Sequence, residues 1–483
     1  MGRRAIPITF VIVLAVAGCS SDGKSRSAKP GATSTTTRSA GGVGAPGIGD
    51  PYFPDSGNGG YDVTHYDLRI AYTPTQPEIW ATATLDSVAG RNLDAFNLDF
   101  SGLRVDGITV GGRPAKYSRS GDELTIKPRS RLAKGTRYTT TVRYHGVPHT
   151  VTDPSESAPP EAGQLGWTRG DDGNVFVVSE PIGARTWFPS NDHPADKATF
   201  DITVDVPDSV AVASNGALTQ GPVHEHRRAW HWSMDRPMAT YLATVVIAPM
   251  REQQTRSPAG VTIRNYFPTD SFDANSPSFA KTGAMIDYFA TLFGPYPFGQ
   301  YGAVVVKPEL GYALETQTMS LFGSDMLGTD SEAEMTVAHE LAHQWFGDSV
   351  GIRRWADIWL NEGWATYSQL LWAAHADPAI DLNRVMVNLR ASEAKKLTPP
   401  NDPGADGLFT TAIYDRGALA LHALRRTVGD QKFFEIARQW NMKYRYGTAT
   451  TAEFVALANT VAGRDLTEFL HSWLDANTVP VLP

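Results

Sequence analysis

The first half of the chain alternates polar and apolar residues, the pattern of strands that bury one face. The alternation is clearest in three stretches, Thr64–Thr73, Glu78–Val88 and Ala198–Val206. Gly, Pro, Asn and Asp residues separate these short runs, as they do at turns between strands. Period-two runs at this spacing predict an antiparallel β-rich domain, a sandwich or a saddle, over residues 51–250.

The second half changes to helical periodicity. Ser278–Gly294 is amphipathic and ends on a glycine, and several later stretches repeat the pattern. Tyr301–Leu310 has the composition of one more strand. Sequences that fit a helical capping box begin at Ser331 and at Thr450, each with a glutamate three residues later. We therefore predict a mostly helical second domain over residues 251–483.

The N-terminus carries the pattern of an export signal. Arg3 and Arg4 precede an apolar run, Ala5–Ala17, which is too short to span a bilayer. The sequence Val-Ala-Gly-Cys that ends at Cys19 resembles the bacterial lipobox, in which the cysteine receives a diacylglycerol. We predict a signal peptide over residues 1–18 and lipidation of Cys19. The alternative is a plain secretory signal in which the cysteine stands by chance.

A stretch rich in Ser, Thr, Gly and Ala follows, without apolar periodicity. We interpret residues 19–50 as a lipidated flexible tether between the membrane and the folded domains. The predicted location is extracytoplasmic, with the protein anchored to the cell membrane. Cys19 is the only cysteine of the chain, so a disulfide within one chain is impossible.

Composition and charge exclude some classes of partner. The chain has 483 residues, of which 41% are hydrophobic and 19% charged, and its formal net charge is −8. This is a globular composition with room for two or three domains. A mildly acidic chain lacks the basic surface that nucleic acid or anionic lipid would require. Its charge fits cationic ligands, such as peptide amines.

The most specific chemical signal is the sequence HELAH at residues 339–343. On a helix, His339 and His343 are four residues apart and point the same way, so both imidazoles can reach one ion. Glu340 lies beside that position, where a carboxylate can take a proton from an activated water. A third ligand is needed, and Glu362 follows His343 by 19 residues. A single helical histidine is usually structural, but this combination predicts one zinc ion per chain.

These residues and several longer blocks resemble the aminopeptidase N family of zinc metallopeptidases, the gluzincins. The blocks are LFGPYPFGQYG, VAHELAHQWFGD, IWLNEGWATY and ARTWFPSNDHPADKATF, and the resemblance covers about Tyr61–Trp473. It implies a β-rich N-terminal domain followed by a thermolysin-like catalytic domain. It also implies that the protein is a zinc aminopeptidase, whose partners are peptides with a free N-terminus.

The resemblance assigns roles to further residues. Tyr414, in IYDRGAL, matches the tyrosine that hydrogen-bonds the tetrahedral oxyanion. Glu315, in GYALETQT, and Glu180, in SEPIGAR, match the two acidic positions that hold the free α-ammonium group of the substrate, and Arg185 would anchor Glu180. Two carboxylates aimed at one ammonium ion would place the first peptide bond at the metal.

The chain departs from the family pattern in two places. Leu314 and Thr316 replace the methionine and asparagine of the family's Gly-Ala-Met-Glu-Asn loop, and this predicts an altered substrate groove. The large C-terminal helical domain of many relatives does not follow here, which predicts a more open site. Three alternative functions remain at this stage: an endopeptidase or an epoxide hydrolase on the same scaffold, or a non-catalytic cell-surface binding protein.

Overall fold

The computed structural model describes residues 42–155, 163–328, 331–394 and 398–483. The predicted signal peptide, the lipidation site Cys19 and most of the predicted tether lie outside these residues. Residues 42–50 belong to the fold, although the sequence predicts them to be the end of the tether. The short strand β1 (Gly42–Val43) pairs with β4 (Leu93–Asp99), and the side chain of Asp50 is buried.

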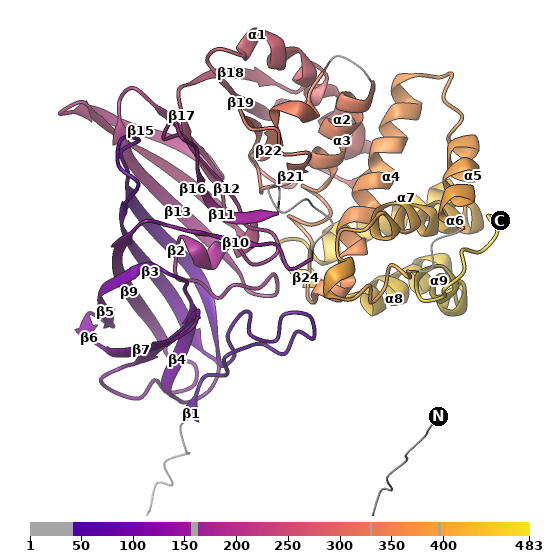
Figure 1. Cartoon of the computed structure of the whole chain (residues 1–483). Coiled ribbons are helices and arrows are strands. Elements are labelled where there is room, and N and C mark those ends of the chain that lie inside the picture. Colours follow the sequence, from indigo (N-terminus) through magenta and orange to yellow (C-terminus); the bar gives the residue numbers. More distant parts are fainter. Residues whose placement is uncertain (1–41, 156–162, 329–330, 395–397) are drawn as a thin grey trace, which may run out of the picture. The chain divides into compact units, whose positions relative to one another are not determined.

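An eight-stranded sheet dominates the N-terminal half (Figure 1). Its order is β15-β16-β13-β2-β3-β9-β5-β6, and neighbours run antiparallel except for β2 and β13, which are parallel. Side chains of β13 alternate between partly exposed and buried along its whole length, as the period-two pattern predicts. The strands are β2 (Tyr61–Ala71), β3 (Ile79–Ala89), β5 (Arg104–Val110), β6 (Arg113–Pro114), β9 (Arg137–Gly146), β13 (Lys197–Pro207), β15 (Ala217–His224) and β16 (Arg227–Ala239).

Two smaller sheets complete this half, with strand orders β1-β4-β8-β7 and β10-β11-β12-β17-β14. Aromatic side chains fill the core beneath the large sheet; Tyr66 stacks on Phe200 with ring centroids 4.7 Å apart. The predicted β-rich N-terminal domain is confirmed. The remaining strands of these sheets are β7 (Lys116–Ser120), β8 (Glu123–Lys127), β10 (Thr150–Thr152), β11 (Gln164–Arg169), β12 (Val175–Val178), β14 (Ala211–Ser214) and β17 (Val245–Ala248).

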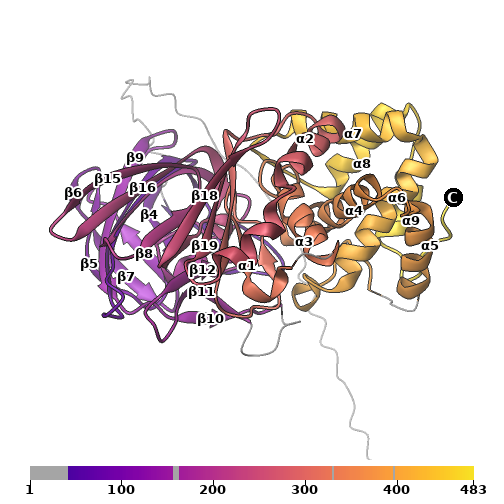
Figure 2. The same ribbon diagram turned by 90° about the horizontal axis from the view of Figure 1, so that it is seen from above.

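The C-terminal half contains a five-stranded sheet of order β18-β19-β20-β22-β21. Figure 2 shows β18 and β19 between the large sheet and the helices. The sequence predicts one strand here, which corresponds to β20. It misses β18 because that strand is mostly exposed and polar. The strands are β18 (Met250–Arg256), β19 (Thr262–Pro268), β20 (Gln300–Val306), β21 (Ala313–Leu314) and β22 (Ser320–Gly323).

Helices form the rest of the C-terminal half, as predicted. Among the helices of the described residues, none is both long and apolar enough to span a bilayer. The helices are α1 (Phe272–Asn275), α2 (Thr282–Phe293), α3 (Ser331–Ala342), α4 (Trp359–Ala376), α5 (Leu382–Glu393), α6 (Gly417–Val428), α7 (Asp430–Lys443), α8 (Thr451–Ala462) and α9 (Thr467–Leu474), and the short strands β23 (Gly351–Ile352) and β24 (Thr448–Ala449) pair between them.

The two predicted capping boxes have different outcomes. Thr450 caps α8, and Glu453 returns the hydrogen bond to its backbone, so this box is confirmed. The box at Ser331 is wrong because Ser331 is already the first helical residue of α3. The glutamate of that box, Glu334, instead pairs with Lys281 at 2.6 Å and accepts a hydrogen bond from the Trp372 indole.

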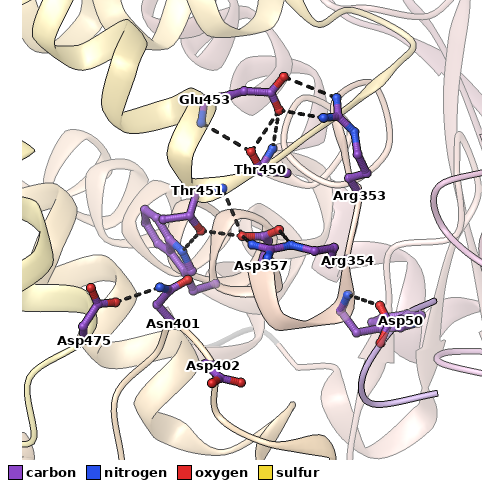
Figure 3. Close-up of polar contacts among 12 residues, drawn as sticks. Asp50, Arg353, Arg354, Asp357, Asn401, Asp402, Thr450, Thr451, Glu453 and Asp475 are labelled. Atoms are coloured by element: carbon purple, nitrogen blue, oxygen red, sulfur yellow. Dashed lines mark hydrogen bonds and ion pairs between the residues drawn. The ribbon is translucent and has the colours of Figure 1, made fainter. Parts of the chain in front are cut away.

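A buried carboxylate fixes the chain just before α4. Asp357 accepts hydrogen bonds from the guanidinium of Arg354 and from both the backbone N–H and the hydroxyl of Thr451 (Figure 3). Nearby, Asp50 accepts a hydrogen bond from the backbone N–H of Trp355 at 3.0 Å. These contacts tie the start of α4 to α8 and to the N-terminal segment, and so fix where the first turn of α4 presents its side chains.

Candidate active site

Two histidines and a glutamate meet where α3 ends and α4 begins. His339 lies in the last turn of α3, and His343 follows one turn later, after the helix ends at Ala342. Glu362 lies in the first turn of α4. Its Oε2 atom is 3.3 Å from Nε2 of His339 and 3.4 Å from Nε2 of His343. The structure therefore brings the three predicted ligands together, with their donor atoms within 4.8 Å of one another.

Each histidine is held by a hydrogen bond on its other ring nitrogen. Nδ1 of His339 lies 2.8 Å from Oε1 of Gln369, and Nδ1 of His343 lies 3.0 Å from the carbonyl oxygen of Phe346. Both acceptors require a proton on Nδ1. In a neutral imidazole the Nε2 atom then carries no proton, so each histidine can bind a metal ion through Nε2. A buried His₂Glu set with outer partners fits a catalytic zinc ion, as predicted.

The sequence interpretation missed Gln369. It lies seven residues after Glu362, two turns further along α4, and therefore on the same face of that helix. This spacing is the signal that could have found it.

The protonation state of the ligand carboxylate suits metal binding. Burial works against ionisation of Glu362, but His343 and His339 lower its pKa to about 2. The carboxylate is therefore ionised at neutral pH and available to a cation.

Glu340 lines the cavity next to these ligands. The cavity has a volume of about 260 Å³, and its walls include His339, His343, Glu362 and Tyr414. Burial raises the pKa of Glu340 well above its ordinary value, and the charges of Glu315 and Glu362 add to that shift. A carboxyl group with a raised pKa is a stronger base when ionised, which suits proton transfer.

Tyr414 lies against His339 in the wall of the same cavity. It lies in a π-helical turn, Ala412–Arg416, directly before α6. Its ring stacks on that of His339 with centroids 6.0 Å apart. Burial, together with the charge of Glu362, raises the pKa of the tyrosine hydroxyl, so it stays protonated and can donate a hydrogen bond.

Glycine brings this turn close to α4. A Cβ atom on Gly363 would lie 2.9 Å from Cα of Gly417, a distance too short for any side chain. The two backbones can therefore touch directly after Glu362 and shortly after Tyr414.

Glu180 and Glu315 complete the acidic group, although they come from different parts of the fold. Glu180 follows β12 of the N-terminal half, and Glu315 follows β21 of the C-terminal half. Both side chains are buried, and Oε1 of each has no hydrogen-bond partner among the residues that the structure describes. Carboxylate oxygens of Glu180, Glu315 and Glu362 lie within 4.8 Å of one another.

This concentration of buried carboxyl groups favours a cationic ligand. Burial raises the pKa of both Glu180 and Glu315, and for Glu180 the charge of Glu315 is the next largest cause. Unpartnered buried carboxylates are costly unless a positive ligand neutralises them. The site is therefore complementary to a metal ion at one end and to a small cation, such as an ammonium group, at the other.

Hydrogen bonds fix the two chain segments that carry these glutamates. Gln344 donates a hydrogen bond to the carbonyl oxygen of Glu315 and accepts one from the backbone of Thr318 at 2.8 Å. Thr316 is fully buried, and its hydroxyl bonds the carbonyl oxygen of Met319. Thr316 therefore stabilises the turn after Glu315 rather than lining the groove.

The segment after Glu180 is fixed by Arg185. The guanidinium of Arg185 donates hydrogen bonds to Asp192 and Ser56, so Arg185 anchors this segment and not the carboxylate of Glu180 itself.

Comparisons with known proteins agree with this arrangement. The model of the peptidase M1 N-terminal domain matches residues 63–242, and that of the peptidase family M1 domain matches residues 278–473. The chain is 27% identical over 341 residues to aminopeptidase M1-B of Oryza sativa subsp. japonica, covering 65% of this chain and 38% of that protein. It is 29% identical over 281 residues to aminopeptidase N of Canis lupus familiaris, covering 52% of this chain and 29% of that protein. The chain thus spans under two fifths of the length of these curated relatives.

Solved structures of similar size also match. An M1 zinc metallopeptidase from Deinococcus radiodurans superimposes with a TM-score of 0.81 at 29% identity, over 90% of this chain and 98% of that one. A mutant of the Deinococcus enzyme bound to a Tyr-Ser-Ala substrate superimposes with a TM-score of 0.82.

Proposed function

The chain belongs to peptidase family M1, and we propose that it is a zinc-dependent aminopeptidase that removes the N-terminal residue of peptides. One observation carries this proposal. Two buried glutamates, Glu180 and Glu315, lie directly beside the His₂Glu metal site, and each has a carboxylate oxygen with no hydrogen-bond partner in the described part of the chain. A metal site alone would serve many hydrolases, whereas this neighbour predicts a positively charged substrate end.

The carboxylates set the register of cleavage. The α-ammonium group of a peptide would form charge-assisted hydrogen bonds with Glu180 and Glu315. Because these carboxylates are adjacent to Glu362, the carbonyl of the first residue then lies at the metal ligands. An internal peptide bond brings no ammonium group and leaves both carboxylates without a counterion, which disfavours an endopeptidase.

The remaining side chains supply proton transfer and oxyanion binding. His339, His343 and Glu362 would hold a zinc ion, which would supply a Lewis acid for the scissile carbonyl and for the attacking water. Glu340 accepts a proton from that water and passes it to the leaving amine. Tyr414 donates a hydrogen bond to the oxyanion that develops on the carbonyl oxygen.

We also propose that the protein is a lipoprotein outside the cytoplasmic membrane. The support is the sequence alone: an apolar run of signal length that ends in Val-Ala-Gly-Cys at Cys19. Replacing Cys19 with serine should release the protein from the membrane fraction. Continued sedimentation of Cys19→Ser with membranes would refute the lipid anchor.

Aminoacyl amides test the enzymatic proposal. A zinc-loaded preparation should cleave leucyl and alanyl fluorogenic amides, and a chelator should abolish cleavage until zinc is restored. Absence of any cleavage across a panel of free aminoacyl amides, with zinc bound, would overturn it.

A further inference from the structure

An exposed tryptophan, Trp80, stands on the outward face of the large sheet. It lies in β3 between Ile79 and Ala81, which are buried in the core, whereas Trp80 is 57% exposed. A single exposed aromatic ring is common on protein surfaces and needs no explanation by itself. The residues around this ring, however, form a groove with one face of the indole as a wall.

The residues in register with Trp80 leave a gap on one side of its ring. The row across β9, β3, β2 and β13 reads His145, Trp80, Ala71 and Asp205 (Figure 1). The ring of His145 stacks on Trp80 with centroids 4.4 Å apart, so it covers the indole face toward β9. The other face is turned toward Ala71, whose side chain is too small to cover it. Two strand spacings, about 10 Å, separate the backbones of Trp80 and Asp205 across this gap.

Two hollows of the surface meet at the gap. Their volumes are about 550 and 380 Å³, and Ala71, Trp80 and Asp205 line both of them. Among the residues that the structure describes, neither hollow shares a lining residue with the cavity at the metal ligands. We call the two hollows together the sheet groove.

The charges that line the sheet groove balance. Within the described residues of the lining, three arginines stand beside three acidic residues, so their formal charges cancel. These residues are Arg69, Arg143, Arg227, Glu78, Asp106 and Asp205. A polyanion or a polycation would meet like charges here, whereas a neutral ligand with many hydroxyl groups can donate to the carboxylates and accept from the guanidinium groups.

Several of these side chains are held in place and keep polar atoms for a ligand. Arg227 donates to Oδ1 of Asp205 at 2.9 Å, which leaves Oδ2 of that carboxylate. Asp67 accepts from Nε and Nη2 of Arg69 at 3.1 and 3.0 Å, which leaves Nη1 of that guanidinium. Arg143, beside Thr82 in the neighbouring row, makes no hydrogen bond or ion pair with the described part of the chain.

The stacked pair that forms the wall is also fixed. Nδ1 of His145 lies 2.8 Å from Oδ2 of Asp106, so the imidazole that supports Trp80 is anchored to β5. The indole therefore presents a flat, oriented face to the gap, which lowers the entropy that a ligand loses on binding.

We propose that the sheet groove binds a neutral oligosaccharide, with one sugar ring in the gap against Trp80. The C–H groups on one face of a pyranose ring pack on the electron-rich face of the indole. The hydroxyl groups at the edge of the sugar ring donate to Asp205 and accept from Arg69. A protein partner would require an apolar surface around the tryptophan, whereas six charged side chains share this lining. The proposal does not depend on the aminopeptidase activity.

A panel of soluble sugars tests the groove. Cellohexaose, maltohexaose and mannohexaose are neutral and present their C–H faces in different arrangements, and hexagalacturonate is a charged counterpart. We expect at least one neutral hexamer to bind the full chain in isothermal titration calorimetry, and to bind more tightly than hexagalacturonate. No binding of any neutral hexamer at millimolar concentration would overturn the proposal.

Two variants locate the bound sugar. Trp80→Ala removes the aromatic wall and should weaken binding at least about tenfold, as loss of a central aromatic contact does. Ala71→Val keeps the wall but fills the gap, and it should weaken binding as well; valine suits a strand, so the fold is kept. The matched control is Tyr117→Ala, which removes an exposed ring from β7 in another sheet and should keep the affinity of the wild type.

Each other outcome contradicts the proposal at a defined point. Unchanged binding by Trp80→Ala would place the sugar outside the sheet groove. Loss of binding in Trp80→Ala but not in Ala71→Val would show that the ligand does not enter the gap. If the chain binds no sugar but self-associates in sedimentation, and Trp80→Ala abolishes the association, the exposed ring belongs to a protein interface.

Discussion

The two ends of the active site differ in how the protein satisfies their polar atoms. At the metal end, His339 and His343 each use one ring nitrogen in a hydrogen bond to the protein and leave the other for the ion. At the amine end, Glu180 and Glu315 each bury a carboxylate oxygen that has no hydrogen-bond partner within the described ranges of the chain. The first end is oriented in advance by the protein, whereas the second is completed only by a cationic ligand.

This difference affects the free energy of substrate binding. A buried ionised carboxylate without a counterion costs several kcal/mol, on the order of what a binding partner can return. A substrate ammonium group bound there would therefore gain more than it would on the surface. That gain is available only to a chain terminus, which is why the geometry predicts an exopeptidase.

We expect the largest loss of activity when the carboxylate that carries the proton is removed. Glu340→Gln should lower kcat by about three orders of magnitude, within the range for loss of a general base. The variant should still bind one zinc ion, because the metal ligands are unchanged. Metal analysis beside a steady-state assay checks both statements, and full activity of the variant would exclude Glu340 as the base.

The next effect concerns oxyanion binding. Tyr414→Phe keeps the ring that stacks on His339 but loses the hydroxyl, so kcat should fall about 100-fold with little change in KM. A change confined to KM would mean that the hydroxyl binds substrate and does not stabilise the oxyanion.

A smaller effect is expected at the amine end. Glu180→Gln and Glu315→Gln should each raise KM for free-amine substrates and lower kcat/KM by up to about 100-fold, because each removes a charged partner of the ammonium group. Zinc content should not change in either variant. If only one variant loses activity, the ammonium group is held from one side alone.

We expect the smallest effect when the hydrogen bond that orients His339 is removed. Gln369→Leu removes the acceptor on Nδ1 of His339 and should weaken zinc binding about tenfold, the low end for such outer partners. Competition with a chromophoric chelator measures this affinity. Gln439→Leu is a matched control on α7, where the glutamine bonds Glu435 and lies away from the site. An unchanged zinc affinity for Gln369→Leu would show that the ring needs no outer partner.

The same two ends differ in how far the sequence predicts them. The metal end depends on helical periodicity, so His339 and His343 could be placed from their spacing of four residues. Gln369 follows from the same geometry. The amine end joins residues 180 and 315, in two loops of different halves, and no local pattern connects them. Only the family resemblance indicated that pair.

In the fold, too, the elements with a local periodic pattern could be predicted, whereas the segments held by long-range contacts could not. Alternating strands with one buried face were predicted well, whereas β18 was missed because an exposed strand has no apolar period. Residues 42–50 were expected to be tether because small and polar residues carry no periodic signal. Their place in the fold depends on long-range contacts, such as that of Asp50 with the backbone of Trp355.

We propose that the buried carboxylates at the amine end select substrates with a free N-terminus. The most direct measurement compares kcat/KM for one aminoacyl amide and its N-acetylated twin, in the wild type and in the Glu180→Gln/Glu315→Gln double variant. We expect a strong preference for the free amine in the wild type, and a fall in that preference by about 100-fold or more in the double variant. Equal cleavage of both substrates by the wild type would contradict this proposal, because the carboxylates would then have no role in choosing the substrate.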